Sequence, residues 1–408
     1  MRRNFVALAW QGAFLTGATA LAQPTTILPA YIAALGGSPL LIGLMLTVLL
    51  TGNVLPELLF AHVVEGSPRK RPYLLVAVFS RAAAWLILGA ATWLLRRSAA
   101  GELLFVLFLL LAVFAVGGSL GSVAYTDVYG KAIPAGARGR FYASLQFLGA
   151  IVALAVTYLA AGVLGGRPGA LTGSYALLFL GAGLLLLVAG LGFVLVREAP
   201  SPAVPQPRLG AYLRQIPAFW REDPGLRALV LVENVASLHL MLLPFYMVLA
   251  VDWLHVPPSA AALYTMAQVV GGALSNLLWG PLNDRRGSGA VLRACLALGT
   301  AMPVLALGLA AFAPTAYVLI FVLLGAAMNS RALAYNNVLV DRSPIPLRAT
   351  YTGLVGTLTA PSLLLPLLGG TLIALFGFHI VFLGVAAALA IAWGTLGRSP
   401  SLFAPARG

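Results

Sequence analysis

The sequence is poor in charge, in cysteine and in lysine. Charged residues make up 9% of the 408 positions and hydrophobic residues 61%, whereas soluble globular proteins average about 25% and about 45–50%. A water-soluble protein of this size needs far more charge to cover its surface. The single cysteine, Cys295, excludes a disulfide-rich secreted domain, and the high apolar content excludes a disordered chain. The composition therefore indicates a polytopic membrane protein.

Long apolar stretches account for most of the chain. A helix needs about 20 apolar residues to cross a bilayer, and runs of this length lack the alternation of a lipid-facing barrel strand. Twelve windows of this kind are predicted, six on each side of a polar segment: near 5–33, 39–63, 73–95, 103–126, 141–164 and 174–196, and near 228–253, 259–282, 290–312, 315–338, 349–376 and 379–397. The sequence predicts an all-α membrane protein of twelve transmembrane helices in two pseudo-symmetric six-helix bundles.

The polar segment between the two sets of spans differs in composition from the rest. It is rich in proline, carries charges of both signs and has little apolar periodicity, as is typical of a linker. We therefore expect an N-terminal six-helix bundle over residues 1–200, a cytoplasmic linker over 201–227 and a C-terminal six-helix bundle over 228–408.

The N-terminus also has features of a secretory signal peptide. Two arginines precede an apolar run, and small residues at 18–22 imitate a cleavage site. Hydrophobicity continues past that site to Leu35, and cleavage would leave eleven spans. We therefore expect this segment to be the first transmembrane helix.

The formal net charge of +14 has two explanations. A basic protein can bind nucleic acid or acidic lipid, but lysine and arginine also collect in the cytoplasmic loops of membrane proteins. With the N-terminus placed inside, three of the 25 basic residues fall on outside loops and two within spans, so that the other 20 lie inside. Because the charge follows topology, we expect no nucleic-acid partner, and both termini in the cytoplasm.

Two segments of the chain repeat at an interval of 210 residues. This shift aligns residues 124–128 with 334–338, Pro134 with Pro344 and Arg138 with Arg348. Parallel six-helix repeats are a known transporter architecture, with the binding site between the halves.

Residues 280–287, between spans 8 and 9, carry the most specific motif. Their sequence Gly-Pro-Leu-Asn-Asp-Arg-Arg-Gly resembles the G-x-L-x-D-R-x-G signature of the major facilitator superfamily. Residues 61–71 form a degenerate first-half copy, in which Glu65 replaces the aspartate, and the segments that open spans 5 and 11 are similar to the same superfamily. The resemblance covers nearly the whole chain in topology and is almost silent on substrate. Span 5 has no good match to the G-P-x-x-G-G signature of drug antiporters.

The resemblance implies a cytoplasmic gate between the two halves. Asp284 would meet the region of Arg138 and Arg140, Glu65 would meet Arg348, and Gly280 would let helices approach closely. The gate residues implied in this way are Gly280, Asp284, Arg285, Glu65, Arg138 and Arg348. The alternative is that these charges are solvated markers of topology.

Four ionisable residues are clear cases of a position inside a predicted span: Glu57, Arg81, Glu233 and Arg331. Such residues are costly in hydrocarbon and normally face a partner or a water-filled cavity. Glu57 and Arg81 lie at similar predicted depths and could form a structural ion pair. The resemblance implies that spans 1, 4, 7 and 10 line the central cavity, which places Glu233 and Arg331 there. Glu233 could carry a coupling proton, because burial favours the neutral form of a carboxylate; a structural pair with Arg331 is the alternative.

Uncharged polar residues on the same spans are further candidates for the cavity lining. These candidates are Gln23, Asn234, Asn329 and Asn336. Asn329 and Asn336 are seven residues apart and share one helical face. Polar side chains in membrane helices also serve as links between helices, and this alternative stays open.

Two other function classes, ATP-driven pumps and enzymes, need motifs that the sequence lacks. An ATP-driven pump within one chain needs a phosphate-binding loop with a lysine, and neither Lys70 nor Lys131 fits one. One cysteine and four scattered histidines give no catalytic or metal-binding constellation. We therefore expect no enzyme activity, no cofactor and no metal.

The function predicted from the sequence is secondary active transport of a small solute across the plasma membrane by alternating access, coupled to protons. The alternative is a non-transporting receptor or scaffold built on a transporter fold. No long extramembrane domain and no N-x-[ST] acceptor is present, so we expect a prokaryotic inner membrane, and a monomer whose partners are the solute, lipid and protons. Few cavity charges favour a small neutral or amphipathic solute, such as a drug-like efflux substrate, while sugars and organic anions stay open.

Overall fold

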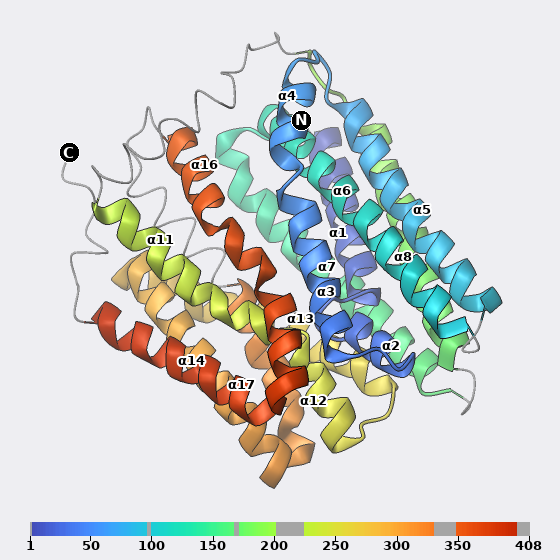
Figure 1. Ribbon diagram of the computed structural model, residues 1–408. Coiled ribbons are helices and arrows are strands. Elements are labelled where there is room, and N and C mark those ends of the chain that lie inside the picture. Colours follow the sequence, from blue (N-terminus) through green and yellow to red (C-terminus); the bar gives the residue numbers. More distant parts are fainter. Residues whose placement is uncertain (1, 96–98, 167–170, 201–223, 330–347, 398–408) are drawn as a thin grey trace.

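The computed structural model of the chain describes residues 2–95, 99–166, 171–200, 224–329 and 348–397. Within these ranges the regular structure is helical, without a strand. Figure 1 shows the helices in two groups that lie side by side, one from each half of the sequence.

The N-terminal group holds the six predicted spans in eight helices. Its helices are α1 (Arg2–Leu21), α2 (Ile27–Ala34), α3 (Pro39–Val54), α4 (Glu57–Glu65), α5 (Arg71–Leu95), α6 (Ala100–Ala132), α7 (Arg138–Leu164) and α8 (Leu171–Leu195). The helices α1, α5, α6, α7 and α8 pack against one another, and α3 and α4 cover α6. Large side chains from several of these helices, among them Tyr31, Phe141, Tyr175 and Phe179, are fully buried between them.

The C-terminal group repeats the plan with more breaks in its helices. Its elements are α11 (Pro224–Ala236), the 3-10 turn η3 (Ser237–Met241), α12 (Phe245–Leu254), α13 (Ser259–Arg286), α14 (Ser288–Phe312), the helical stretch Pro314–Asn329, α16 (Arg348–Thr359), the 3-10 turn η6 (Ala360–Leu364) and α17 (Leu365–Gly397). We expected the C-terminal bundle to begin at residue 228, and α11 begins four residues earlier. Residues 201–223 lie outside the described residues.

The predicted fold of twelve spans is confirmed. In the described part of the chain, nine helical stretches are long and apolar enough to cross a membrane. One of them, Leu354–Gly394, has 41 residues, about twice what one crossing needs, and it reverses at Gly377, where φ is +77°. The two other predicted spans correspond to the α1–α2 pair and to Pro314–Asn329, and residues 330–338 of the latter span lie outside the described residues.

Prolines account for the breaks within three spans. Span 1 is interrupted between α1 and α2, where Pro24 lies, and span 7 between η3 and α12 at Pro244. Span 2 is divided at Pro56 into α3 and α4. A proline lacks the N–H that continues a helix, and in a membrane such breaks are tolerated where the freed groups are buried within protein.

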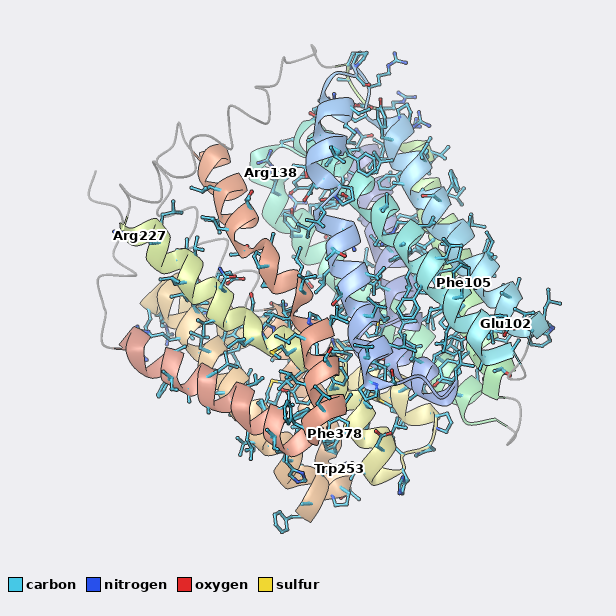
Figure 2. All side chains as sticks on the ribbon, viewed as in Figure 1. Glu102, Phe105, Arg138, Arg227, Trp253 and Phe378 are labelled. Atoms are coloured by element: carbon cyan, nitrogen blue, oxygen red, sulfur yellow. The ribbon has the colours of Figure 1, made fainter. Side chains whose placement is uncertain are left out.

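The two ends of the helix groups differ in charge. We call the end that holds the start of α1, the α4–α5 turn and the start of α7 the basic end, and the opposite end, where α2 and α12 lie, the far end. Figure 2 shows Arg138 and Arg227 toward the basic end, and Trp253 and Phe378 at the far end. The ring centroids of Trp253 and Phe378 are 5.8 Å apart. Aromatic side chains are typical of a membrane–water interface.

The outer surface of the helices is apolar. Phe105 is 71% exposed and points outward from α6 in Figure 2, and Leu277 and Ile391 are similarly exposed. An apolar surface this extensive would aggregate in water, whereas hydrocarbon solvates it. The chain is a multi-pass membrane protein.

Candidate functional site

The two halves are in close contact at the far end. A Cβ placed on Gly43 of α3 would lie 2.2 Å from the carbonyl oxygen of Pro366, and one on Gly370 of α17 would lie 2.4 Å from that of Pro39. Side chains at either position would hold the helices apart. The hydroxyl of Thr47 also accepts a hydrogen bond from the backbone N–H of Leu367, at 3.0 Å. Glycine therefore permits the contact of α3 with α17 that closes this end.

Hydrogen bonds between span 1 and span 8 join the halves next to that contact. The hydroxyl of Thr25 donates to Oε1 of Gln268 at 2.7 Å, and the hydroxyls of Thr26 and Thr265 are 2.5 Å apart. All four side chains are buried. Since buried polar groups are costly without a partner, these contacts stabilise the closed far end.

A cavity of about 780 Å³ lies between the halves on the basic side of these contacts. Its walls come from α1, α7, α13 and the stretch Pro314–Asn329, that is, from both halves. Among its lining residues, Tyr142 is 50% exposed, and Thr16, Thr19 and Asn276 are also exposed. The described structure is therefore closed at the far end and accessible from the basic end.

The lining of this cavity is rich in uncharged polar groups. Amides come from Gln23, Gln146, Gln268, Asn276 and Asn329. Gln23 and Asn329, two of the four predicted cavity residues, are among them. Asn329 also donates from Nδ2 to the carbonyl of Gly272 at 2.9 Å, which joins span 10 to span 8. The lining can form hydrogen bonds with a polar solute.

The cavity is lined by spans 5 and 8 (α7 and α13), whereas the resemblance implied that spans 4 and 7 would line it. Asn234 is not among the described lining residues: its Nδ2 donates to the carbonyls of Val230 and Leu358 at 3.0 and 3.3 Å, and so links α11 to α16. Asn336 and Arg331 lie outside the described residues.

Glu233 is buried in α11, with 8% of its surface exposed. It precedes the break of span 7, and its carbonyl accepts a hydrogen bond from the hydroxyl of Ser237 at 2.7 Å. It is not among the described lining residues of the large cavity. A carboxylic acid at this place is shielded from lipid and water by protein.

The ion pair expected between Glu57 and Arg81 is not formed between these two described residues. Oε1 of Glu57 accepts a hydrogen bond from Ser122 of α6 at 2.9 Å. The guanidinium of Arg81 lies beside Gly118, which is also on α6. Four residues on α6 separate the two contact points, about 6 Å along the axis. Glu57 is the first residue of α4, which Pro56 separates from α3.

The gate motif is open in this structure. Asp284, Arg138 and Arg140 are exposed, and none of these three described residues pairs with another. A Cβ on Gly280 would meet no described atom within 4 Å, so the described residues do not make the close helix approach that we expected there.

The other members of the motif are placed differently. Arg285 is exposed at the end of α13, and Gly287, with φ +77°, makes the turn into α14. A positive φ of this kind favours glycine. The side chains of Glu65 and Arg348 lie outside the described residues.

Glu198, which the sequence analysis did not single out, organises the basic end of the N-terminal half. Its carboxylate accepts hydrogen bonds from the backbone N–H groups of Lys70 and Arg71 at 2.7 and 2.8 Å, and lies 3.6 Å from Nζ of Lys131. Its side chain is 2% exposed. It joins the α4–α5 turn to α6 from the segment that follows α8.

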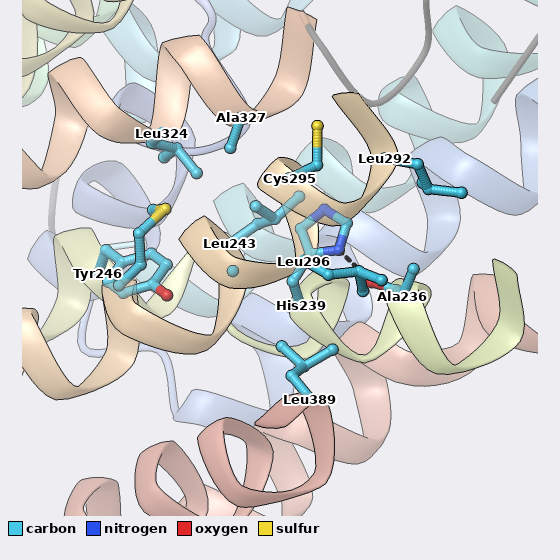
Figure 3. A pocket seen from close by; sticks show the side chains of 12 residues that line it. Ala236, His239, Leu243, Tyr246, Leu292, Cys295, Leu296, Leu324, Ala327 and Leu389 are labelled. Atoms are coloured by element: carbon cyan, nitrogen blue, oxygen red, sulfur yellow. Dashed lines mark hydrogen bonds between the residues drawn. The ribbon is translucent and has the colours of Figure 1, made fainter. Parts of the chain in front are cut away.

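A second, small cavity lies within the C-terminal half (Figure 3). Its volume is about 30 Å³ and its lining includes His239, Tyr246 and Cys295. Nδ1 of His239 lies 2.6 Å from the carbonyl oxygen of Ala236. The space suits about one water molecule and is too small for a solute. No cluster of three or more metal-binding side chains occurs in the described part of the chain.

Comparison with known proteins agrees with this geometry. The sequence model of the Major Facilitator Superfamily matches residues 241–401. No curated protein matches the sequence. Among solved structures, a mutant of the nucleoside transporter NupG superposes with a TM-score of 0.74 at 12% identity, covering 98% of this chain and 100% of that one.

Two further solved structures show the same fold. A transporter of the POT family in complex with 5-aminolevulinic acid has a TM-score of 0.74 at 12% identity and covers 98% of this chain and 97% of its own. A bacterial homologue of the iron transporter ferroportin, in an inward-facing state, has a TM-score of 0.72 at 14% identity and covers 98% of each chain.

The chain therefore has the fold of these solved membrane transporters. By its sequence match over residues 241–401 it is also similar to the major facilitator superfamily.

Proposed function

We propose that the protein is a secondary active transporter that moves a small solute by alternating access and couples this movement to protons. The observation that carries the proposal is the cavity of about 780 Å³ between the halves, which is lined by polar residues from both halves and is closed at the far end. A site between two helix bundles that rock against each other is exposed to one side of the membrane at a time.

The basic end is placed on the cytoplasmic side, with both termini there, in a prokaryotic plasma membrane. Arg3, Lys70 and Arg71 lie at this end, where they bond to backbone and side-chain groups of their own half. An excess of basic residues marks the cytoplasmic face of membrane proteins. In this orientation the described structure is inward-open, and the open gate motif of Asp284 would close when the cavity turns outward.

Glu233 is the residue proposed to carry the coupling proton. Its carboxyl group is buried in the last turn of α11, four residues before the 3-10 turn η3 that precedes the break of span 7. A broken helix can change its local conformation during rocking, and burial makes the charge of a carboxylate costly. Loading and release of a proton at this site would then accompany the change of state. Arg331 remains a proposed partner, since it lies outside the described residues.

Glu233→Gln should uncouple solute movement from protons. The amide has nearly the same size but cannot release a proton, so a pH gradient should no longer drive solute accumulation, whereas exchange of solute across the membrane should persist. The measurement uses proteoliposomes with a lumenal pH dye and a panel of radiolabelled solutes. The matched control is Glu102→Gln, since Glu102 is exposed on the first turn of α6.

Two outcomes would count against this proposal. Accumulation that depends on pH as strongly in Glu233→Gln as in the unmodified protein would remove the role of Glu233. Solute binding without any counterflow would favour the alternative, a receptor or scaffold built on the transporter fold.

A further inference from the structure

Arg81 is a basic residue near the middle of the membrane. It is the eleventh residue of α5, which has 25 residues, and ten residues of helix span about 15 Å, half of the hydrocarbon thickness. Its guanidinium carbon lies 4.2 Å from the ring centroid of Phe114. A cation in hydrocarbon is costly and is normally retained for a function.

The neighbouring helix is shaped to admit this side chain. A Cβ on Gly117 of α6 would lie 3.0 Å from Cγ of Arg81, and one on Gly118 would lie 3.9 Å from its Cζ. A Cβ on Gly118 would also lie only 2.2 Å from Oδ1 of Asn53. Two consecutive glycines therefore leave room for the arginine between spans 3 and 4.

No anionic group of the described structure neutralises Arg81. Its Nε is buried and has no hydrogen-bond partner, and the described residues give it no ion pair. Glu57, the partner that the sequence analysis suggested for Arg81, is bonded to Ser122. The quadrupole of the Phe114 ring favours the cation, but a ring supplies no hydrogen-bond acceptor for the guanidinium N–H groups.

Arg81 lines a cavity of about 380 Å³ within the N-terminal half. Polar side chains of Gln11, Ser122, Tyr125 and Thr126 share this lining. The cavity adjoins the large one between the halves, because Leu15, Thr16 and Leu145 line both. A solute bound between the halves could thus extend one group toward Arg81.

We propose that Arg81 binds the anionic group of the transported solute, and that this group is a carboxylate of a small organic acid. The inference rests on the proposed function and names the substrate class for it. The planar guanidinium matches the two oxygens of a carboxylate, and the amide-rich wall around Gln268 and Asn276 accommodates the uncharged remainder. The Arg81 site therefore distinguishes organic acids from neutral solutes of equal size.

The experiment compares acids with amides of the same shape. Purified full-length protein is titrated with four acid–amide pairs: acetate and acetamide, lactate and lactamide, benzoate and benzamide, and nicotinate and nicotinamide. Chloride and inorganic phosphate are titrated separately. Binding raises the midpoint of thermal unfolding and gives a Kd. At least one acid should bind about tenfold more tightly than its amide, the difference expected for a charge-assisted hydrogen bond.

Variants assign the difference to this residue. Arg81→Gln should remove the preference for the acid, and Arg81→Lys should keep part of it, because the charge remains while the paired donors are lost. Arg69→Gln, at an exposed arginine outside the spans, is the matched control and should bind as the unmodified protein does. If Arg81→Gln does not fold, the acid–amide comparison and Arg81→Lys still decide the outcome.

The inference is overturned if no acid is preferred to its amide, if Arg81→Gln retains the preference, or if only chloride or inorganic phosphate binds. Counterflow in proteoliposomes separates this failure from that of the proposed function. A neutral amide that exchanges equally well in the unmodified protein and in Arg81→Gln would leave transport intact and remove the Arg81 site. An acid that binds through Arg81 but never exchanges would leave the site and remove transport.

Discussion

Gly43→Val should lower the transport rate by about tenfold while the protein still folds. The Cβ would lie 2.2 Å from the carbonyl oxygen of Pro366, so α3 and α17 could not approach as they do in the closed far end. Overpacking of this kind costs typically about 1–3 kcal/mol, and each 1.4 kcal/mol shifts the population of two states about tenfold. The variant should therefore accumulate with the far end open.

The matched control for this variant is Gly308→Val in α14, where a Cβ would meet no atom within 4 Å. It adds the same side chain to a membrane helix without a neighbour to displace, and its transport rate should stay near that of the unmodified protein. Equal transport by Gly43→Val and Gly308→Val, at equal amounts of folded protein, would show that closure of α3 on α17 is not required.

Thr19→Trp should block the large cavity and reduce transport to near the background of empty liposomes. Thr19 lines the cavity, its side chain is exposed, and its hydroxyl donates only to the carbonyl of Leu15 in its own helix. The indole can therefore project into the cavity without displacing packed neighbours. Counterflow of any solute moved by the unmodified protein is the measurement.

The control for the blocked cavity is Leu109→Trp. Leu109 is 55% exposed on α6, and an indole there would face lipid instead of the cavity. Leu109→Trp should transport as the unmodified protein does. Both variants should also keep the thermal unfolding midpoint of the unmodified protein. Undiminished counterflow in Thr19→Trp would mean that the solute passes elsewhere.

The fold could be predicted from the sequence because the bilayer imposes a simple rule. Each crossing needs a long apolar helix, and the windows of hydrophobicity correspond to the observed spans. The breaks next to Pro24 and Pro244 were also predictable, since proline interrupts helical hydrogen bonding.

The site was harder to predict because it depends on how helices rotate and bend. Gln23 and Asn329 are among the lining residues of the cavity, but Gln268, which both lines it and bonds across the halves, resembles any polar residue that links helices. Glu57 bonds to Ser122 and not to Arg81, since equal depth along two helices does not determine which faces meet.

Glu198 illustrates a second limit of the sequence. It follows the last apolar span of the N-terminal half, just before the expected linker. Its role depends on the turn before α5 lying beside it. Lys70 was counted only as one of the 20 basic residues inside, yet it is 3% exposed. Charge counts predict the side of the membrane on which a residue lies and not what the residue contacts.

The central claim, alternating access around the cavity, is tested most directly by distances between spin labels at the two ends. In a chain whose one cysteine is replaced (Cys295→Ala), one pair of labels is placed at Ser38 and Phe376 at the far end, and another at Arg69 and Arg286 at the basic end; all four residues are exposed. Each pair joins the two halves.

The account predicts two populations at each end, with opposite changes. Gly43→Val should lengthen the distance between the far-end labels and shorten the distance between the basic-end labels, relative to the same labels with Gly43 retained. Distances that lengthen together at both ends, or a single population that Gly43→Val leaves unchanged, would contradict alternating access.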